Sequence, residues 1–513
     1  MSDNESGPEQ DEREADVDPD ETQQSASDEV GGERGAHDIA SNPSITDREA
    51  AANDAAEAEY RRLRPRRAAL YGTRALAGLA GVAILTLGVS TVQAVPELVA
   101  MEAPVAEVQP ALASQQRVCA APFLQIISDD PAAPSRIDGA GSVASVFLPE
   151  GPTETTSIPV ADASVEAGVL TEPEGELSLA GASFVRLADD MLHTGFATSE
   201  CSEPATQQWL LGGATTTGRS SVLAIANPSA VAASLNIEIY SVEGQVASVG
   251  NTGIVVQAGS VATIDLASLA PNLEDPVVKI DATGGPVSAR IYATTTRGLE
   301  TGGNEILDPM TASTSQVIPG VEIEALTGIQ TQEGFADLVP VLRVFAEEST
   351  NATLTTTARD GEPITVDLNL VGGQVQDIPL DELAPGTYTF TVKSEQAVVA
   401  AARTVRVLPD TSNDYSWTNG ASALPTNAQF IVPNAPGATV HYANPTETPM
   451  SIEVDGETVE LPASGGISIP GGGEHEVLSD GVVVGASFIQ GATSTGFVLT
   501  PPGPAADGIT VSW

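Results

Sequence analysis

Histidines and acidic pairs are the side chains of this 513-residue chain most suited to catalysis or metal binding. The chain has only four histidines, which are His37, His193, His441 and His475. His475 lies between Glu474 and Glu476 in the glycine-rich segment GGGEHEV, where carboxylates could raise its pKa or share a metal. Adjacent side chains in a strand or loop point apart, however, and no second histidine lies at ligand spacing. We therefore expect a solvated loop at His475 and no metal site.

Signatures of catalysis and of nucleotide binding are absent from the sequence. It contains no Gly-x-Ser-x-Gly elbow, no Ser-x-x-Lys pair, no P-loop and no strand-GxGxxG-helix unit. The acidic pairs Asp129-Asp130 and Asp189-Asp190 offer oxygen ligands for calcium, but their spacing is not that of an EF-hand loop. The sequence thus predicts a protein that is not an enzyme and has no cofactor. An unrecognised hydrolase or metal enzyme that uses His193, His441 or His475 is the remaining alternative.

The two cysteines, Cys119 and Cys201, lie near the two ends of one β-like region. In an exported chain they would meet an oxidising compartment, so the sequence predicts a Cys119–Cys201 disulfide. The alternative is a pair of buried free thiols.

Composition limits the class of protein. Asp and Glu number 69 against 21 Lys and Arg, which gives a net charge of −48 and argues against a nucleic acid partner. The 48 glycines, 36 prolines and few aromatic residues favour a turn-rich β architecture. A chain of this length also predicts several domains.

The segment 75–95, ALAGLAGVAILTLGVSTVQAV, has no charged residue and is long enough to span a bilayer as a helix. Residues 61–74 carry six arginines and no acid, so the positive-inside rule places the N-terminus in the cytoplasm and the rest outside. We expect a retained single-pass signal anchor in the cell membrane. The alternatives are a signal peptide cleaved after Ala94 and, less favoured, a buried core helix.

Residues 1–60 hold 19 acidic residues against three arginines and contain few large apolar side chains. Such a segment cannot bury enough surface to offset its chain entropy, so we expect a disordered cytoplasmic tail. It either docks a basic partner or serves only as a solvated tail.

An internal repeat divides the chain beyond residue 104. The segments 258–272 and 372–386 align at six positions, with Val261, Ile264, Leu266, Leu269, Ala270 and Pro271 over Val375, Ile378, Leu380, Leu383, Ala384 and Pro385. Alternating apolar residues run into acid-Gly turns at 243–244, 360–361 and 455–456, which is a hairpin pattern. Each copy closes with a short apolar run at 286–293, 397–404 and 482–489, typical of a buried strand.

These patterns predict a mostly β protein with tandem immunoglobulin-like β-sandwich modules outside one transmembrane helix. Three modules are expected at 205–312, 313–412 and 424–513. A further, diverged module is expected before them, at 104–204, and it holds the disulfide.

A family resemblance rests on the segments Trp209 to Gly213, Gly218-Arg219, Leu223, Ala226 to Pro228 and Pro385 to Tyr388. These segments resemble an actinobacterial family of exported, membrane-anchored proteins of unknown function. The resemblance covers about Gln116 to Trp513. It implies an envelope location and a β architecture, it implies no reaction, and it supplies no catalytic residue. A gene neighbourhood with a large glycosyltransferase, which the resemblance also implies, suggests a role near envelope polysaccharide.

Two functions are therefore the leading hypotheses. The first is a non-enzymatic extracytoplasmic scaffold or binding protein of the bacterial cell envelope, which meets an unknown protein or glycan. The second is an accessory subunit of a membrane glycan-assembly complex, in which the membrane segment and the tail contact an enzyme partner. Co-purification with a transferase would separate the two.

Overall fold

The computed structural model describes residues 105–108, 115–127, 135–148, 153–172, 179–187, 195–332, 334–359, 361–426, 428–479, 481–501 and 509–512. The chain divides into two units, Met1–Ala103 and Pro104–Trp513. The predicted tail, basic segment and transmembrane helix lie outside the described residues. Within the residues described, no helix is both long enough and apolar enough to cross a membrane.

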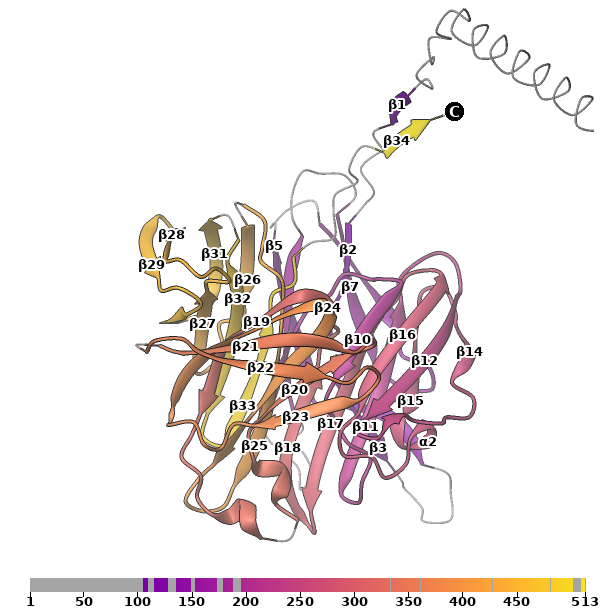
Figure 1. The fold of residues 1–513 in the computed structure, drawn as a ribbon. Helices are drawn as coiled ribbons and strands as arrows, with labels where there is room; N and C mark the ends of the chain where they lie inside the picture. The colour runs from indigo at the N-terminus through magenta and orange to yellow at the C-terminus, as the bar shows by residue number, and fades with distance from the viewer. Residues whose placement is uncertain are drawn as a thin grey trace, which may run out of the picture. The chain divides into compact units, whose positions relative to one another are not determined.

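The unit Pro104–Trp513 consists mainly of antiparallel β-strands, as the sequence predicted (Figure 1). The helical segments among its described residues are short, namely α2 (Leu266–Leu269), η1 (Ile329–Thr331) and η2 (Ala336–Leu338). Alternation of apolar and polar residues produces the strands, as in β12 (Ala233–Ser241), where Leu235, Ile237 and Ile239 are buried on one face. Near the two ends of this unit, β1 (Val105–Val108) pairs with β34 (Ile509–Ser512).

Four groups of sheets follow in chain order, and they are named the first to fourth modules. In the first module, one sheet has the order β2 (Gln115–Val118), β7 (Glu166–Glu172), β6 (Glu154–Pro159). Another pairs β3 (Phe123–Ile127) with β4 (Arg136–Ala140). A further sheet has the order β5 (Ser142–Leu148), β8 (Ala180–Arg186), β9 (Phe196–Glu200). The second has sheets with the orders β10 (Gln207–Leu211), β16 (Val277–Gly284), β12, β13 (Gly244–Gln245), with β14 (Thr252–Val256) also on β12; and β15 (Ser260–Asp265), β11 (Arg219–Asn227), β17 (Ser288–Arg297), β18 (Glu300–Leu307).

The third module is one seven-stranded sheet, because the long strand β24 (Gly386–Val407) serves both of its halves. The first half of β24 carries β19 (Ser313–Ile323), β21 (Thr350–Ala358) and, beyond β21, β22 (Ile364–Leu370). The second half carries β25 (Asn413–Asn419), β20 (Val341–Ala346) and, beyond β20, β23 (Val375–Pro379). The fourth module has sheets with the orders β26 (Ala428–Val432), β31 (Gly473–Leu478), β28 (Met450–Val454), β29 (Glu457–Leu461); and β30 (Gly466–Pro470), β27 (Ala438–Ala443), β32 (Val483–Gln490), β33 (Thr493–Val498).

The strand order repeats from module to module. The orders β15-β11-β17-β18, β23-β20-β24-β25 and β30-β27-β32-β33 correspond strand by strand, and β5-β8-β9 of the first module keeps three of the four positions. The aligned residues Val261 and Val375 are buried at equivalent places, in β15 and β23. In the hairpin between β28 and β29, Asp455 and Gly456 have φ of 50° and 82°, which suits a two-residue turn. The repeat in the sequence is therefore a repeat of topology.

The end of the third module differs from the expectation. The sequence analysis ended this module at residue 412, but β25 (Asn413–Asn419) continues its sheet. Tyr415 and Trp417 alternate with polar residues as in a half-buried strand, but the predicted modules leave this segment out, between residues 412 and 424. Asp414 and Ser416 are buried as well, so both faces of the strand are covered.

The last strands of the four modules lie together at one centre. Strand β9 contacts β18 and β33, and β25 contacts the same two strands, so the four form a closed ring. Strands β18, β25 and β33 can be followed side by side in Figure 1.

Buried apolar clusters also cross the module boundaries. They include Trp209 with Phe345 between the second and third modules, Val118 with Tyr292 between the first and second, Phe196 with Phe497 between the first and fourth, and Val317 with Val483 between the third and fourth. The four modules thus share hydrophobic cores and are not independently packed domains.

Candidate functional site: an arginine-lined pocket

Cys119 and Cys201 form the disulfide that the sequence predicted. Both residues are buried, and their Cα atoms lie 4.1 Å apart. Cys119 follows β2 and Cys201 follows β9, and beside them the amide of Val118 donates to the carbonyl of Ser202 at 2.9 Å. The bridge therefore ties the first strand of the first module to its last strand, which is a structural role.

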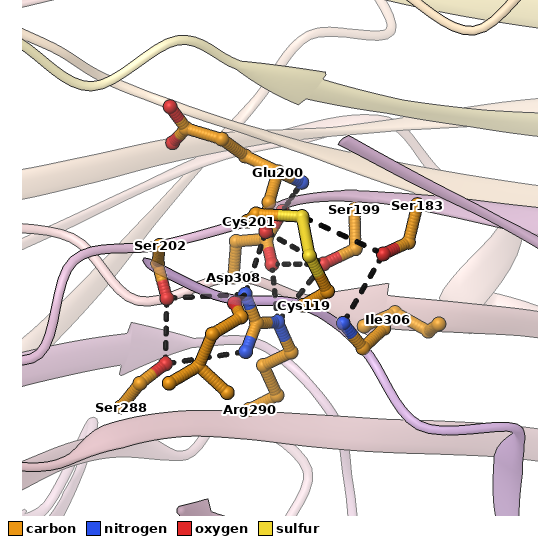
Figure 2. Close-up of polar contacts among 12 residues, drawn as sticks. Cys119, Ser183, Ser199, Glu200, Cys201, Ser202, Ser288, Arg290, Ile306 and Asp308 are labelled. Carbon is orange, nitrogen blue, oxygen red and sulfur yellow. Dashed lines mark hydrogen bonds and ion pairs between the residues drawn. A yellow bond between two sulfur atoms is a disulfide. The ribbon is translucent and has the colours of Figure 1, made fainter. Parts of the chain in front are cut away.

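Next to the disulfide, the buried side chain of Arg290 joins the first module to the second (Figure 2). Its guanidinium donates to the carbonyl oxygens of Val118 at 2.7 Å and Glu200 at 2.6 Å, and it pairs with Asp308 at 3.0 Å. The hydroxyls of Ser199, Ser202 and Ser288 complete its contacts. Because the charge is paired and its donors are well used, this cluster holds strands together and leaves little for a ligand.

Carboxyl groups also lie at the centre of the ring of last strands. Thr495 donates to Glu305 at 2.9 Å, and Asp414 accepts from the amides of Asn304 and Ser494. Burial, with Asp414 nearby, raises the pKa of Glu305 well above its usual range. Burial likewise raises the pKa of Asp414 to about 7.

These raised pKa values make stability depend on pH. A carboxyl with a folded pKa near 7 keeps its proton over a range in which the unfolded carboxyl, with a pKa near 4, has lost it. The folded state then binds more protons, so the free energy of unfolding decreases as pH rises through this range. His441 acts in the opposite sense, because burial lowers its pKa from 6.5 to about 4, and the stability linked to its neutral form is lost as pH falls below 6.5.

The histidines occupy structural positions where they are described. His441 lies in β27, is 3% exposed and bonds Ser468 and Ser487 at 2.8 Å each. Gly320, with φ of 67°, lies against its ring, and a Cβ there would come within 2.2 Å of His441 Cγ. The neutral ring bonds one hydroxyl through each nitrogen and so joins β27 to β30 and β32.

His475 corrects one expectation. The sequence analysis placed it in a solvated loop, but it lies in β31, with Nδ1 2.8 Å from Asp455 Oδ2 and its ring 5.4 Å from Phe430. The segment pairs with β26, and this long-range pairing is what makes it a strand.

Other residues considered for chemistry lie outside the described part of the chain. They are His37, His193 and the acidic pairs Asp129-Asp130 and Asp189-Asp190. Among the residues that are described, no group of three or more His, Cys, Asp or Glu side chains is placed to hold a metal ion.

A pocket of about 990 Å³ opens between the second and third modules. Residues 104–513 contain ten arginines, and four of them line this pocket, namely Arg219, Arg297, Arg343 and Arg403. Arg219 begins β11 and Arg297 ends β17, so they lie at the same end of this antiparallel pair of strands. Arg343 and Arg403 come from the paired strands β20 and β24. The packing of the two modules brings these pairs together.

Three of the four arginines are held by carboxylates. Arg219 and Arg297 donate to the same oxygen of Asp337, at 2.8 Å and 2.7 Å. Arg343 forms a two-pronged pair with Asp377 at 2.8 Å and 2.7 Å. The guanidinium of Arg297 also lies 5.0 Å from the centre of the Phe335 ring. The part of the pocket lining that these arginines form is therefore rich in cations, and ion pairs hold their side chains in place.

The fourth arginine shares an aromatic ring with its neighbour. Arg343 and Arg403 lie over Trp417, at 4.9 Å and 5.7 Å from the ring centre. Burial and the nearby charge of Arg343 lower the pKa of Arg403 to about 10, so it stays charged at neutral pH. Five carboxylates also line the pocket, and two of them, Asp337 and Asp377, pair with the arginines. The side of the pocket that holds the four guanidinium groups is suited to bind an anion.

The sequence analysis missed this pocket. It named Arg219 only within the family resemblance, and it did not single out Arg297, Arg343 or Arg403. These residues lie far apart along the chain and belong to no local motif. The one signal in the sequence is that arginine is scarce in a chain so rich in acidic residues.

The fold and the pocket define a β-rich protein of four related modules with a ligand-sized cavity between two of them. The chain belongs to the family of unknown function DUF5719, which matches residues 155–482. No curated protein matches the sequence. Among solved structures, the chain is similar to one described as "Crystal Structure of Thermotoga maritima 1070", with 16% identity and a TM-score of 0.18 over 22% of this chain and 95% of that chain.

Proposed function

We propose that this chain is a non-enzymatic, membrane-anchored binding protein of the bacterial cell envelope, and that its ligand places an acidic group in the arginine-lined pocket. The observation that carries the proposal is the gathering of four of the ten arginines of residues 104–513 around one cavity. Like charges at close range repel one another, and the two carboxylates that pair with the arginines, Asp337 and Asp377, offset part of that repulsion. The other three acidic residues of the lining, Glu274, Asp275 and Glu300, form no ion pair with these arginines among the described residues. An anionic ligand would supply the rest.

The proposal includes an extracytoplasmic location. Residues 75–95 would form the retained anchor and the six arginines of 61–74 would stay in the cytoplasm. The disulfide supports this location, because such bridges persist in oxidising compartments. We also propose that the paired sheets of the modules are immunoglobulin-like sandwiches.

Impermeant maleimide labelling of intact spheroplasts tests the location. A Val249→Cys variant places a thiol at a site that is 93% exposed, and we expect it to react without permeabilisation. A Ser25→Cys variant, in the acidic tail, should react only after the membrane is opened.

Protection of the cysteine at position 249 in intact spheroplasts would refute the location and the envelope function with it. A mature N-terminus at Val95 would replace the anchor by a cleaved signal and keep the binding site outside.

A further inference from the structure

Arg403 is the exception among the arginines of the pocket. Among the described residues it forms no ion pair, and its Nη2 donates to the carbonyl oxygen of Val339 at 2.9 Å. Its Nε is buried and has no hydrogen-bond partner in the same part of the chain. A buried polar group without a partner is costly, and a guanidinium offers five N–H donors. Arg403 also lines the pocket and has donors left on its terminal nitrogens, so it is placed to donate to a partner from outside the chain.

The geometry of a guanidinium favours one kind of partner. Its planar fork matches two oxygens of a carboxylate or a phosphate. Arg343 is less suited to this part, because Asp377 and the carbonyl oxygen of Pro276 take three of its five N–H donors. The free capacity of the pocket is thus concentrated at Arg403.

The outer lining of the pocket has the opposite charge. Glu274, Asp275 and Glu300 belong to it, and Glu274 and Glu300 are exposed. Acidic side chains at the rim repel further negative charge on a ligand at short range.

We propose that Arg403 binds one compact oxyanion, a carboxylate or a phosphate, on a ligand whose remainder is neutral or cationic, and that the acidic rim excludes polyanions. This inference rests on the proposed function and names the ligand class of the same pocket.

Isothermal titration of the full-length chain in detergent micelles tests it with three probes built on the glucose ring and one acidic polysaccharide. They are glucuronic acid, glucose 1-phosphate, neutral glucose and polygalacturonate. We expect one or both acidic monosaccharides to bind, with the tighter one identifying the preferred oxyanion, and we expect glucose and the polymer to bind at least about tenfold more weakly.

Matched variants of β24 identify the residue. Arg403→Gln should weaken the acidic monosaccharides at least about tenfold, and Arg403→Lys, which keeps the charge but loses the fork, should fall between. Arg406→Gln is the control, because Arg406 lies three residues further on the same strand, pairs with Glu324 and does not line the pocket. Its binding should equal that of the wild type, and thermal unfolding would check that each variant is folded.

The outcomes separate the two proposals. Equal binding by the wild type and Arg403→Gln would overturn the role of Arg403 and leave the binding function standing. Glucose or polygalacturonate bound as tightly as glucuronic acid would overturn the ligand class and again leave a ligand pocket. Failure of every probe to bind the wild type would refute both the inference and the acidic ligand of the proposed function.

Discussion

The Arg290→Met variant should unfold at a lower urea concentration than the wild-type chain, with a loss of about 3–5 kcal/mol in the free energy of unfolding. The replacement leaves the carboxylate of Asp308 buried without its partner, because Arg290 is 4% and Asp308 10% exposed. It also removes the donors that reach the backbone of the first module at Val118 and Glu200. We expect the junction of the first and second modules to be the part that opens first.

The control for Arg290 is an ion pair at the surface. Lys393 pairs with Glu447 at 3.1 Å, and these side chains are 42% and 82% exposed. Lys393→Met should cost no more than about 1 kcal/mol, since solvent screens such pairs. Similar losses for the two variants would mean that the Arg290 cluster is not a special tie between modules.

Removal of the disulfide should have a comparable effect. The bridge joins residues separated by 82 positions, so on the chain-entropy view its loss in a Cys119→Ala/Cys201→Ala variant costs about 4 kcal/mol. The buried position of both cysteines adds a smaller packing term. Urea unfolding of the full-length chain, without reductant, measures the difference.

The reductant supplies the control. Dithiothreitol should destabilise the wild type and leave the double variant unchanged. A wild-type chain with the same urea midpoint with and without reductant would show that the bridge contributes nothing to stability.

The β architecture, the repeat and the disulfide could be predicted because their signals are local or recur along the chain. The alternation of Leu235, Ile237 and Ile239 with polar residues predicts a half-buried strand. The pair Asp455-Gly456 predicts a hairpin turn, because both residues adopt a positive φ readily. The pairing of Cys119 with Cys201 needed only the count of cysteines and an argument about compartment.

The closed ring of modules could not be predicted in the same way. The inner strands β9, β18, β25 and β33 bury polar residues such as Thr198, Glu305 and Asp414 against one another. Hydrophobic periodicity treats such residues as solvent-facing, and the strand at 413–419 lies outside the predicted modules 313–412 and 424–513. Only the contacts between modules reveal the bonds among these side chains, such as those of Thr198 and Glu305 with Thr495.

The pocket was hidden for a related reason. Arg219 and Arg403 are separated by most of two modules in the sequence, and each alone reads as an ordinary surface arginine. These two arginines come together because the second and third modules pack against each other. In one such contact, the ring centres of Trp209 and Phe345 lie 5.2 Å apart. A site built at an interface between repeats leaves no motif within one repeat.

Ligand retention by the full-length chain tests the central claim most directly. The wild type and an Arg219→Gln/Arg403→Gln variant would be purified from the same membranes, and the small molecules released on denaturation would be identified by mass spectrometry. We expect an acid-bearing molecule to accompany the wild type and to be lost from the variant. Recovery of the same molecules in equal amounts from both chains, or of none from the wild type, would contradict the proposal that the arginine-lined pocket binds an acidic ligand.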